Sequence, residues 1–202
     1  MLGMVYQTSK LHPTLGINYR GHDLFEIMKK CPKAPGGEEP IPEAVLWLLL
    51  TGEFPNEAEI KEFKEELFER GQLNADEEKL IKALPPYMHP TTMFSMGILA
   101  CQPRSQFANA YRNGLHKSKY WEYTFEDALD LVARASTIAS IVFHNYYGDV
   151  SLNFNIIKNT KIPKRDPSLD YSANYARMLG MDSPDFDELM RLYLTLHAYA
   201  LP

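Results

Sequence analysis

The amino-acid sequence predicts an all-α fold. Apolar residues recur at helical spacing along most of the chain, and residues that start and stop helices punctuate it. No alternation of apolar and polar residues is long enough for more than a short strand. The chain has 202 residues, of which 45% are hydrophobic. It can therefore bury a substantial core, either as one domain or as one domain and part of another.

The beginning of the chain is predicted to be mostly loop. Among residues 1–20 we expect loops with one short extended pair. Residues 31–42, CPKAPGGEEPIP, hold four prolines and two glycines, a composition that excludes a regular element. Pro42 suits the first turn of a helix, where its missing N–H costs little, and Gly52 suits the end of that helix.

The middle of the chain carries repeated helix signals. Two pairs resemble capping boxes, in which each side chain bonds the backbone N–H of the other residue: Asn56 with Glu59, and Asn74 with Glu77. Pro85-Pro86 breaks the second of these helices. His89-Pro90 then starts a segment whose small and flexible residues permit close helix packing.

Residues 125–147 form the longest periodic stretch of the sequence. They are apolar over much of the helix circumference, so this helix should be buried on more than one side. A chain of 202 residues has little with which to bury it, and we therefore expect a partner subunit.

Two further helices are predicted to close the chain. Residues 148–169 are polar and irregular and indicate a loop. The helices follow at about residues 170–180 and 184–199. Gly180 ends the first, and Ser183-Pro184 supplies an N-cap and a first-turn proline for the second.

Composition excludes several classes of function. The net charge is −5 and the pI about 5.7, which argues against nucleic acid as a partner but allows a local basic patch. Cys31 and Cys101 form neither a disulfide framework nor a metal-type pair, so we expect a reducing compartment and no metal site. The longest apolar run, residues 44–50, is far shorter than the about 20 residues of a membrane span. The first ten residues resemble neither a signal peptide nor a transit peptide.

Two stretches could carry chemistry, although no general catalytic motif is present. In GLHKSKYWE, residues 114–122, Lys117 and Lys119 flank the entry to a long helix, with His116 and Arg112 nearby. This is either a solvated basic patch, which composition alone favours, or an anion site for a phosphate-bearing ligand.

The second stretch is the closing helix. Its apolar residues recur at helical spacing: Phe186, Leu189, Met190, Tyr193 and Leu196. His197 follows four residues after Tyr193 and is expected to lie near the apolar face and point inward. It is either a buried histidine satisfied by a backbone carbonyl or a pocket histidine that binds or polarises a substrate. Spacing alone does not separate the two.

Long stretches of the sequence closely resemble citrate synthases of the eukaryotic mitochondrial type. They are GINYRGHDL, CPKAPGGEEPIPEAVLWLLLTGEFP, SQFANAYRNGLHKSKYWE and FDELMRLYLTLH. The resemblance runs from about residue 3 to His197. It implies an all-helical homodimer of the mitochondrial matrix that condenses acetyl-CoA with oxaloacetate to give citrate and CoA in the tricarboxylic acid cycle. Acetyl-CoA is a substrate, and no separate cofactor is implied.

The resemblance also assigns two site residues. Lys117 takes the place of the first basic residue in the family's G-I-H-R-x-K-Y-W-E, an arginine that touches the CoA phosphate. Lysine supplies the charge there but not the bidentate fork. His197 matches the first histidine of the family's H-x-D-H-E-G-G-N. The second histidine of that motif, which binds oxaloacetate, would fall at Ala200.

Several departures from the family limit what the chain is expected to do. The likeness stops within residues 198–202, and the family's basic N-terminal segment has no counterpart here. Residues 148–169 are several residues longer than the family's loop. Residues 1–202 are thus expected to be the N-terminal part of the large domain, without the second domain and with no catalytic residue in this chain.

Three hypotheses remain open. The chain is a fragment of an authentic citrate synthase that is inactive alone, a non-catalytic scaffold or interaction subunit, or another condensing enzyme of the family such as a methylcitrate synthase. The abrupt end of the likeness favours the first, because a long-diverged inactive homologue would have lost its similarity gradually.

Overall fold

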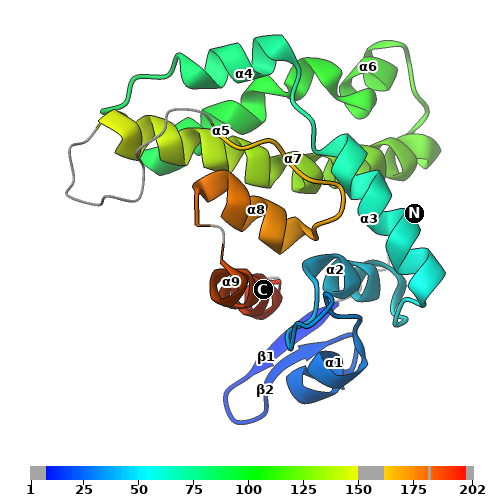
Figure 1. The fold of residues 1–202 in the computed structure, drawn as a ribbon. Coiled ribbons are helices and arrows are strands. Elements are labelled where there is room, and N and C mark those ends of the chain that lie inside the picture. The colour runs from blue at the N-terminus through cyan, green and yellow to red at the C-terminus, as the bar shows by residue number, and fades with distance from the viewer. Residues whose placement is uncertain (1–7, 150–161, 182, 199–202) are drawn as a thin grey trace. The chain divides into compact units, whose positions relative to one another are not determined.

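The computed structural model describes residues 8–149, 162–181 and 183–198. The described chain is mostly helical, with short strands only near its beginning (Figure 1), and the predicted all-α fold is confirmed. It divides into two compact units, which are described separately. Unit 1 comprises Met1–Lys64, Asp166–Ala176 and Asp182–Pro202, and unit 2 comprises Glu65–Arg165 and Arg177–Met181.

Unit 1 begins with a small antiparallel sheet. Its strands β1 (Ser9–His12), β2 (Gly16–Tyr19) and β3 (His22–Asp23) pair in chain order. The connection between β2 and β3 is Arg20-Gly21, where φ is 53° and 93°, a geometry that suits a tight hairpin turn. The expected extended pair is confirmed, and β3 extends it to a third strand.

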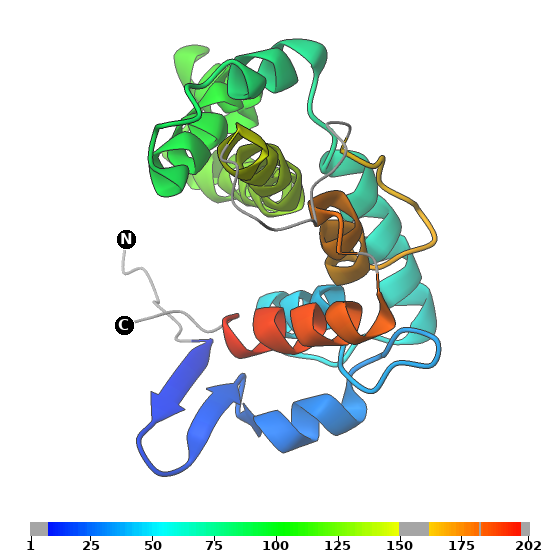
Figure 2. The same ribbon diagram turned by 60° about the vertical axis from the view of Figure 1, so that its left-hand side comes forward.

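Helix α1 (Leu24–Lys30) follows the sheet directly (Figure 2). Its N-cap is Asp23, whose carboxylate accepts the N–H of Glu26 at 2.8 Å. This helix was not predicted from the sequence. The cap provides one of the helix-start hydrogen bonds that the first turn lacks internally.

The remaining helices of unit 1 pack around one apolar core. Helix α2 (Pro42–Thr51) starts at Pro42 and ends at Gly52, where φ is 84°, both as predicted. Helix α9 (Pro184–Leu196) packs against α2, and the two lie side by side in Figure 2. The core cluster consists of Tyr19, Ile27, Cys31, Ile41, Ala44, Val45, Leu48 and Ile60.

Unit 2 is built on one long helix, α7 (Tyr120–Asp149). Helices α4 (Ala75–Lys82), α5 (Pro90–Ala100) and α6 (Gln106–Arg112) all pack against it. The 3₁₀ turns η1 (Gln102–Arg104) and η2 (Lys117–Lys119) connect them. The core cluster consists of Ile81, Met93, Cys101, Ile138, Ile141 and Val142.

Two helices contribute residues to both units. Helix α3 (Glu57–Arg70) passes from unit 1 into unit 2 after Lys64, and α8 (Tyr171–Leu179) does so after Ala176.

Both predicted capping boxes are present. Asn56 accepts the N–H of Glu59 at 3.0 Å and Glu59 accepts that of Asn56 at 2.8 Å. Asn74 and Glu77 are paired in the same way.

Some predicted boundaries were wrong. Helix α7 starts at Tyr120, directly after Lys117 and Lys119, which were expected to flank its entry. It continues to Asp149 and so includes the first residues of the predicted loop. Helix α9 ends at Leu196 rather than at residue 199, and α6 was not predicted. Residues 150–161 of the predicted loop lie outside the described residues, whereas 162–170 contain no helix, as expected.

Helix α7 leaves part of its apolar surface uncovered within the chain. Leu129, Ala133, Ile138, Ile141 and Val142 are buried in unit 2. Four large apolar residues of the same helix are much more accessible, with exposed fractions of 68% for Trp121, 41% for Phe125 and 40% for Leu131 and Val132. Among the described residues, α7 therefore has one buried apolar side and one exposed apolar side.

Candidate functional site

His197 lies immediately after the last turn of α9. Helix α9 begins at the predicted cap, where Ser183 accepts the N–H of Phe186 at 3.3 Å. At the other end the backbone N–H of His197 donates to the carbonyl of Tyr193 at 3.1 Å. The imidazole stacks on the Tyr193 ring with centroids 4.2 Å apart and an interplanar angle of 25°. The ring thus has a defined place relative to the helix end.

The hydrogen bond of the imidazole defines its tautomer. Nδ1 of His197 lies 2.9 Å from the Tyr193 carbonyl oxygen. A carbonyl oxygen only accepts, so Nδ1 carries the hydrogen, and Nε2 of the neutral ring is an acceptor. A charged ring offers Nε2 as a second donor instead. Either form can bond a polar ligand through Nε2.

The predicted inward orientation of His197 was wrong. His197 is exposed, and so is Tyr193, whose exposed fraction is 53%. Leu189 is also exposed at 55%, whereas Met190 and Thr195 are buried. The apolar residues of α9 therefore divide between the core and an open face, and His197 belongs to the open face.

A buried ionic cluster holds the middle of α9 within unit 1. The Arg191 guanidinium donates to Oδ2 of Asp170 from Nη2 at 2.6 Å and from Nε at 3.1 Å. Glu188 pairs with Arg191 and also accepts the N–H groups of Glu38 and Glu39 at 2.9 and 2.8 Å. Burial would raise the pKa of Glu188, but these donors lower it below its ordinary value.

Glu43 extends this cluster to the start of α2. Its Oε1 accepts the N–H of Tyr171 at 2.7 Å, and its buried Oε2 has no hydrogen-bond partner among the described residues. Burial, and then the charge of nearby Asp170, raise the pKa of Glu43 to about 7. The neutral form of the carboxyl is thus favoured at this site more than in an exposed glutamate.

Lys117 is the first residue of η2 and is exposed. Its neighbour Lys119 forms an ion pair with Glu122 at 2.5 Å, which raises the pKa of Lys119. His116 caps η2 by accepting the N–H of Ser118 at 3.3 Å. The predicted basic stretch is therefore an exposed turn at the entry to α7. It belongs to unit 2, whereas His197 belongs to unit 1.

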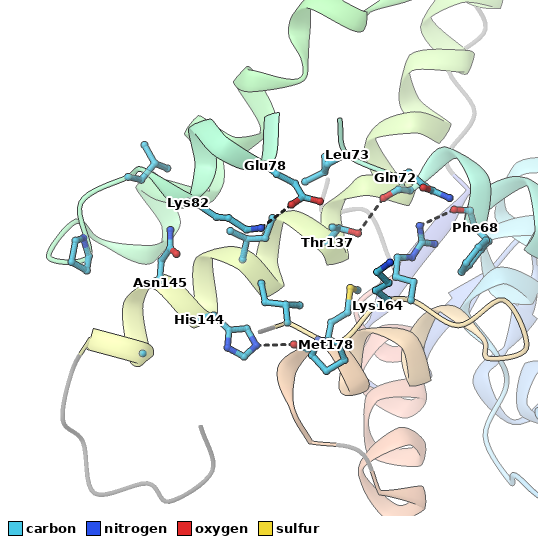
Figure 3. Close-up of a pocket in the computed structure, with 18 residues that line it drawn as sticks. Phe68, Gln72, Leu73, Glu78, Lys82, Thr137, His144, Asn145, Lys164 and Met178 are labelled. Atoms are coloured by element: carbon cyan, nitrogen blue, oxygen red, sulfur yellow. Dashed lines mark hydrogen bonds and ion pairs between the residues drawn. The ribbon is translucent and has the colours of Figure 1, made fainter. Parts of the chain in front are cut away.

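Unit 2 also contains a pocket of about 910 Å³ that neither candidate residue lines (Figure 3). Most polar groups in it are satisfied by the protein. Lys82 pairs with Glu78 at 2.8 Å, His144 donates from Nε2 to the Met178 carbonyl at 2.8 Å, and Arg165 donates to the Phe68 carbonyl at 2.7 Å. The pocket is consequently a weaker candidate for an anion site than its cationic residues suggest.

Within residues 8–149, 162–181 and 183–198, no three His, Cys, Asp or Glu side chains are placed to hold a metal ion together. In the same part of the chain, no helix has the length and apolar character needed to cross a membrane.

Comparison with known proteins identifies related sequences. A family model described as "Citrate synthase, C-terminal domain" matches residues 2–199. The mitochondrial citrate synthase of Kajikia audax is 43% identical over 198 residues, which cover 98% of this chain and 40% of that protein. The Saccharomyces cerevisiae protein of the same name is 42% identical over 196 residues, covering 97% and 39%. The mitochondrial 2-methylcitrate synthase of Yarrowia lipolytica is 41% identical over 197 residues, covering 97% and 40%.

Solved structures share the fold. Citrate synthase from Pyrobaculum aerophilum matches with a TM-score of 0.76 at 20% identity, over 98% of this chain and 46% of that one. The ternary complex of carboxymethyl coenzyme A and oxaloacetate with citrate synthase from Thermoplasma acidophilum matches with a TM-score of 0.64 at 15% identity, over 95% and 44%.

The family model covers nearly the whole chain, and the chain spans about 40% of the length of the curated relatives it matches. The resemblance found in the sequence is confirmed, and the protein belongs to the citrate synthase family.

Proposed function

We propose that residues 1–202 supply part of the large domain of a citrate synthase, which condenses acetyl-CoA with oxaloacetate to citrate and CoA. The observation that carries the proposal is the identity of 42–43% to mitochondrial citrate synthases across 97–98% of this chain. The Thermoplasma acidophilum relative, whose complex holds a coenzyme A derivative and oxaloacetate, supports the choice of substrates. We place the enzyme in the mitochondrial matrix, because these relatives are named mitochondrial.

Within that enzyme, two residues of the chain are assigned to substrates. Lys117 contacts the CoA phosphate, for which an exposed ammonium at a helix entry is suited. His197 starts the segment that binds oxaloacetate, and its Nε2 is directed away from the bond that Nδ1 makes with Tyr193. We further propose that the catalytic acid and base lie outside these 202 residues, and that the working enzyme is a homodimer.

The proposal is tested with a hybrid enzyme. Residues 1–197 are joined to the part of the Saccharomyces cerevisiae citrate synthase that follows its matching segment. The hybrid is expected to release CoA from acetyl-CoA in the presence of oxaloacetate. A matched control carries the same yeast segment behind an unrelated helical domain and should be inactive. A folded hybrid dimer without activity would contradict the proposal.

The same hybrid addresses the choice of acyl group. The 41% identity to a 2-methylcitrate synthase is close to the values for citrate synthases, so propionyl-CoA is a second candidate substrate. Comparing kcat/KM for acetyl-CoA and propionyl-CoA separates the two. We expect acetyl-CoA to be preferred, and the reverse order would assign the chain to the methylcitrate branch.

A further inference from the structure

We propose that Tyr19 is a positioning residue for His197: its hydroxyl holds the last carbonyls of α9 and thereby determines where the imidazole lies. Tyr19 and His197 both belong to unit 1, although they are far apart in the sequence. The inference rests on the proposed function only in its statement that His197 meets a substrate. The contact itself is a property of the fold.

The contact is short and fully enclosed. The Tyr19 hydroxyl donates to the carbonyl oxygen of Thr195 at 2.6 Å, and the carbonyl of Leu196 lies 3.4 Å away. The exposed fraction of Tyr19 is 0%. The last carbonyls of an α-helix have no partner within the helix and need an outside donor when they are buried. The Thr195 carbonyl also accepts the backbone N–H groups of His197 and, at 3.4 Å, of Ala198. The Tyr19 hydroxyl adds a shorter bond, from outside the helix, to the turn that immediately precedes His197.

The position of the imidazole depends on this turn. His197 is bound to α9 through its ring, which stacks on Tyr193 and donates from Nδ1 to the Tyr193 carbonyl. Its backbone N–H bonds the carbonyls of Tyr193 and Thr195, and the second of these is the carbonyl that Tyr19 holds. Helix ends fray when their terminal groups lose their partners. A change in the last turn therefore moves Tyr193 and His197 together.

Tyr19 can serve as an anchor because its surroundings fix it in place. It ends β2, where it pairs with Ser9 of β1 and His22 of β3. The next residue, Arg20, donates from Nε to the Leu49 carbonyl at 2.8 Å and from Nη2 to the Leu50 carbonyl at 3.0 Å. These carbonyls belong to the end of α2, against which α9 packs. The sheet and α2 together thus fix the backbone of Tyr19, and its side chain extends from there to the end of α9.

The hydroxyl, rather than the ring, carries the proposed role. A phenylalanine would fill the same apolar space, and a buried hydroxyl without a partner costs free energy. The hydroxyl is therefore favourable at this buried site because it donates to the Thr195 carbonyl at the end of α9. Nearby Thr195 provides a contrast, since its own side-chain hydroxyl is buried without a partner among the described residues.

The test compares Tyr19→Phe with Thr195→Val in the 202-residue chain, by NMR of the histidine imidazoles. The signal of His197 is assigned with a His197→Gln variant. In Tyr19→Phe, we expect the Nδ1 and Nε2 resonances of His197 to shift, and the His197 amide to exchange at least tenfold faster. The signals of His89 and His116, which belong to unit 2, should stay in place. Thr195→Val removes a hydroxyl from the same turn but leaves the Thr195 carbonyl for Tyr19, so His197 should be unaffected.

Two results would overturn the proposal. One is an unchanged His197 spectrum in a folded Tyr19→Phe protein. The other is an equal shift in both variants, which would trace the effect to general packing of the turn. The experiment uses no substrate, so its outcome is independent of the activity of the hybrid enzyme. An inactive hybrid refutes the proposed function, whereas an unmoved imidazole refutes the role of Tyr19.

Discussion

Lys117 is the residue that we propose contacts the CoA phosphate, at a position where the resemblance implies an arginine in the family. An exposed charge contact of this kind is worth about 1 kcal/mol, which corresponds to about fivefold in affinity. In the hybrid enzyme, Lys117→Ala should therefore raise the KM for acetyl-CoA several-fold and leave the KM for oxaloacetate nearly unchanged. Lys117→Arg should be tolerated or improve the KM, because it restores the bidentate fork. Equal acetyl-CoA KM values for the unaltered hybrid and the alanine variant would contradict the assignment.

Glu43 makes stability depend on pH. Its pKa is raised to about 7 in the folded chain from an ordinary value of 4.5. A raised pKa means that the contribution to stability is complete below pH 4.5 and is lost as the pH rises through 7. The full loss is on the order of 3 kcal/mol. Glu43→Gln keeps an oxygen for the Tyr171 N–H and removes the charge beside Asp170, so it should abolish this loss.

Urea unfolding between pH 5 and pH 8 measures the effect. The unaltered chain should lose more unfolding free energy over this range than Glu43→Gln does. A matched control is Glu53→Gln, a change in an exposed side chain outside the cluster, which should keep the slope of the unaltered chain. Parallel pH profiles for the unaltered chain and Glu43→Gln would show that the buried carboxyl does not titrate in this range.

Individual residues with a local role were easier to predict than those with a distant partner. Asn56, Asn74 and Ser183 were recognised as caps because the N–H groups they bond lie within three residues along the chain. Tyr19 and Glu43 were missed as site and cluster residues. Their partners, Thr195 and Tyr171, lie far along the sequence, and no local pattern marks such a pair.

At the scale of elements, the packing of α5 on α7 depends on Gly97. A Cβ added at Gly97 would lie 2.5 Å from Cγ2 of Ile138. Gly97→Ala should destabilise the chain by about 1–2 kcal/mol, because overpacking outweighs the gain in helix propensity. Gly148→Ala is a matched control near the end of α7, where an added Cβ meets no described residue within 4 Å; it should be neutral or slightly stabilising. Thermal unfolding of both variants decides, and equal melting temperatures would contradict the close approach.

The exposed apolar residues of α5 and α7 predict self-association of the chain through residues 89–104 and 116–147. Leu99 and Trp121, with exposed fractions of 69% and 68%, lie in these segments. Exposed apolar surface promotes association, so Leu99→Glu should shift the chain toward monomer in sedimentation velocity. Tyr87→Glu is a matched control, because Tyr87 is 89% exposed but lies outside both segments. A stable monomer of the unaltered chain at tens of micromolar would count against the prediction.

Long helices were predicted better than short ones. The cap signals and apolar spacing of α2, α3, α4 and α9 identified them within a few residues. Helices α1 and α6, of 7 residues each, are too short to show a clear apolar period. The N-terminus of α6 is also completed from a distance, because Asp127 of α7 accepts the N–H groups of Gln106 and Phe107 at 2.7 and 3.1 Å. Tertiary contacts of this kind are not visible in the local sequence.

For the whole molecule, we expect the 202 residues alone to show no citrate synthase activity. The proposed acid and base lie outside them, and each general acid–base step contributes about 10²–10⁴-fold. The measurement is CoA release from acetyl-CoA and oxaloacetate, with a no-enzyme control and a heated sample. Release above the no-enzyme rate that heating abolishes would place catalytic groups within this chain and refute the prediction.

The division of unit 1 into separate stretches of sequence has a consequence for the order in which the chain folds. During synthesis, most of unit 2 is complete once Arg165 has left the ribosome, whereas unit 1 still lacks α9. The Tyr19 hydroxyl can reach Thr195 only after α9, far along the sequence, has emerged. The entropic cost of closing the loop between two distant residues must be met before their contact can stabilise the chain. Contacts of long sequence separation therefore form late in folding. Until then the apolar core of unit 1 lacks the cover of α9, which packs on α2, and exposed apolar surface of this kind makes incompletely folded chains prone to aggregation.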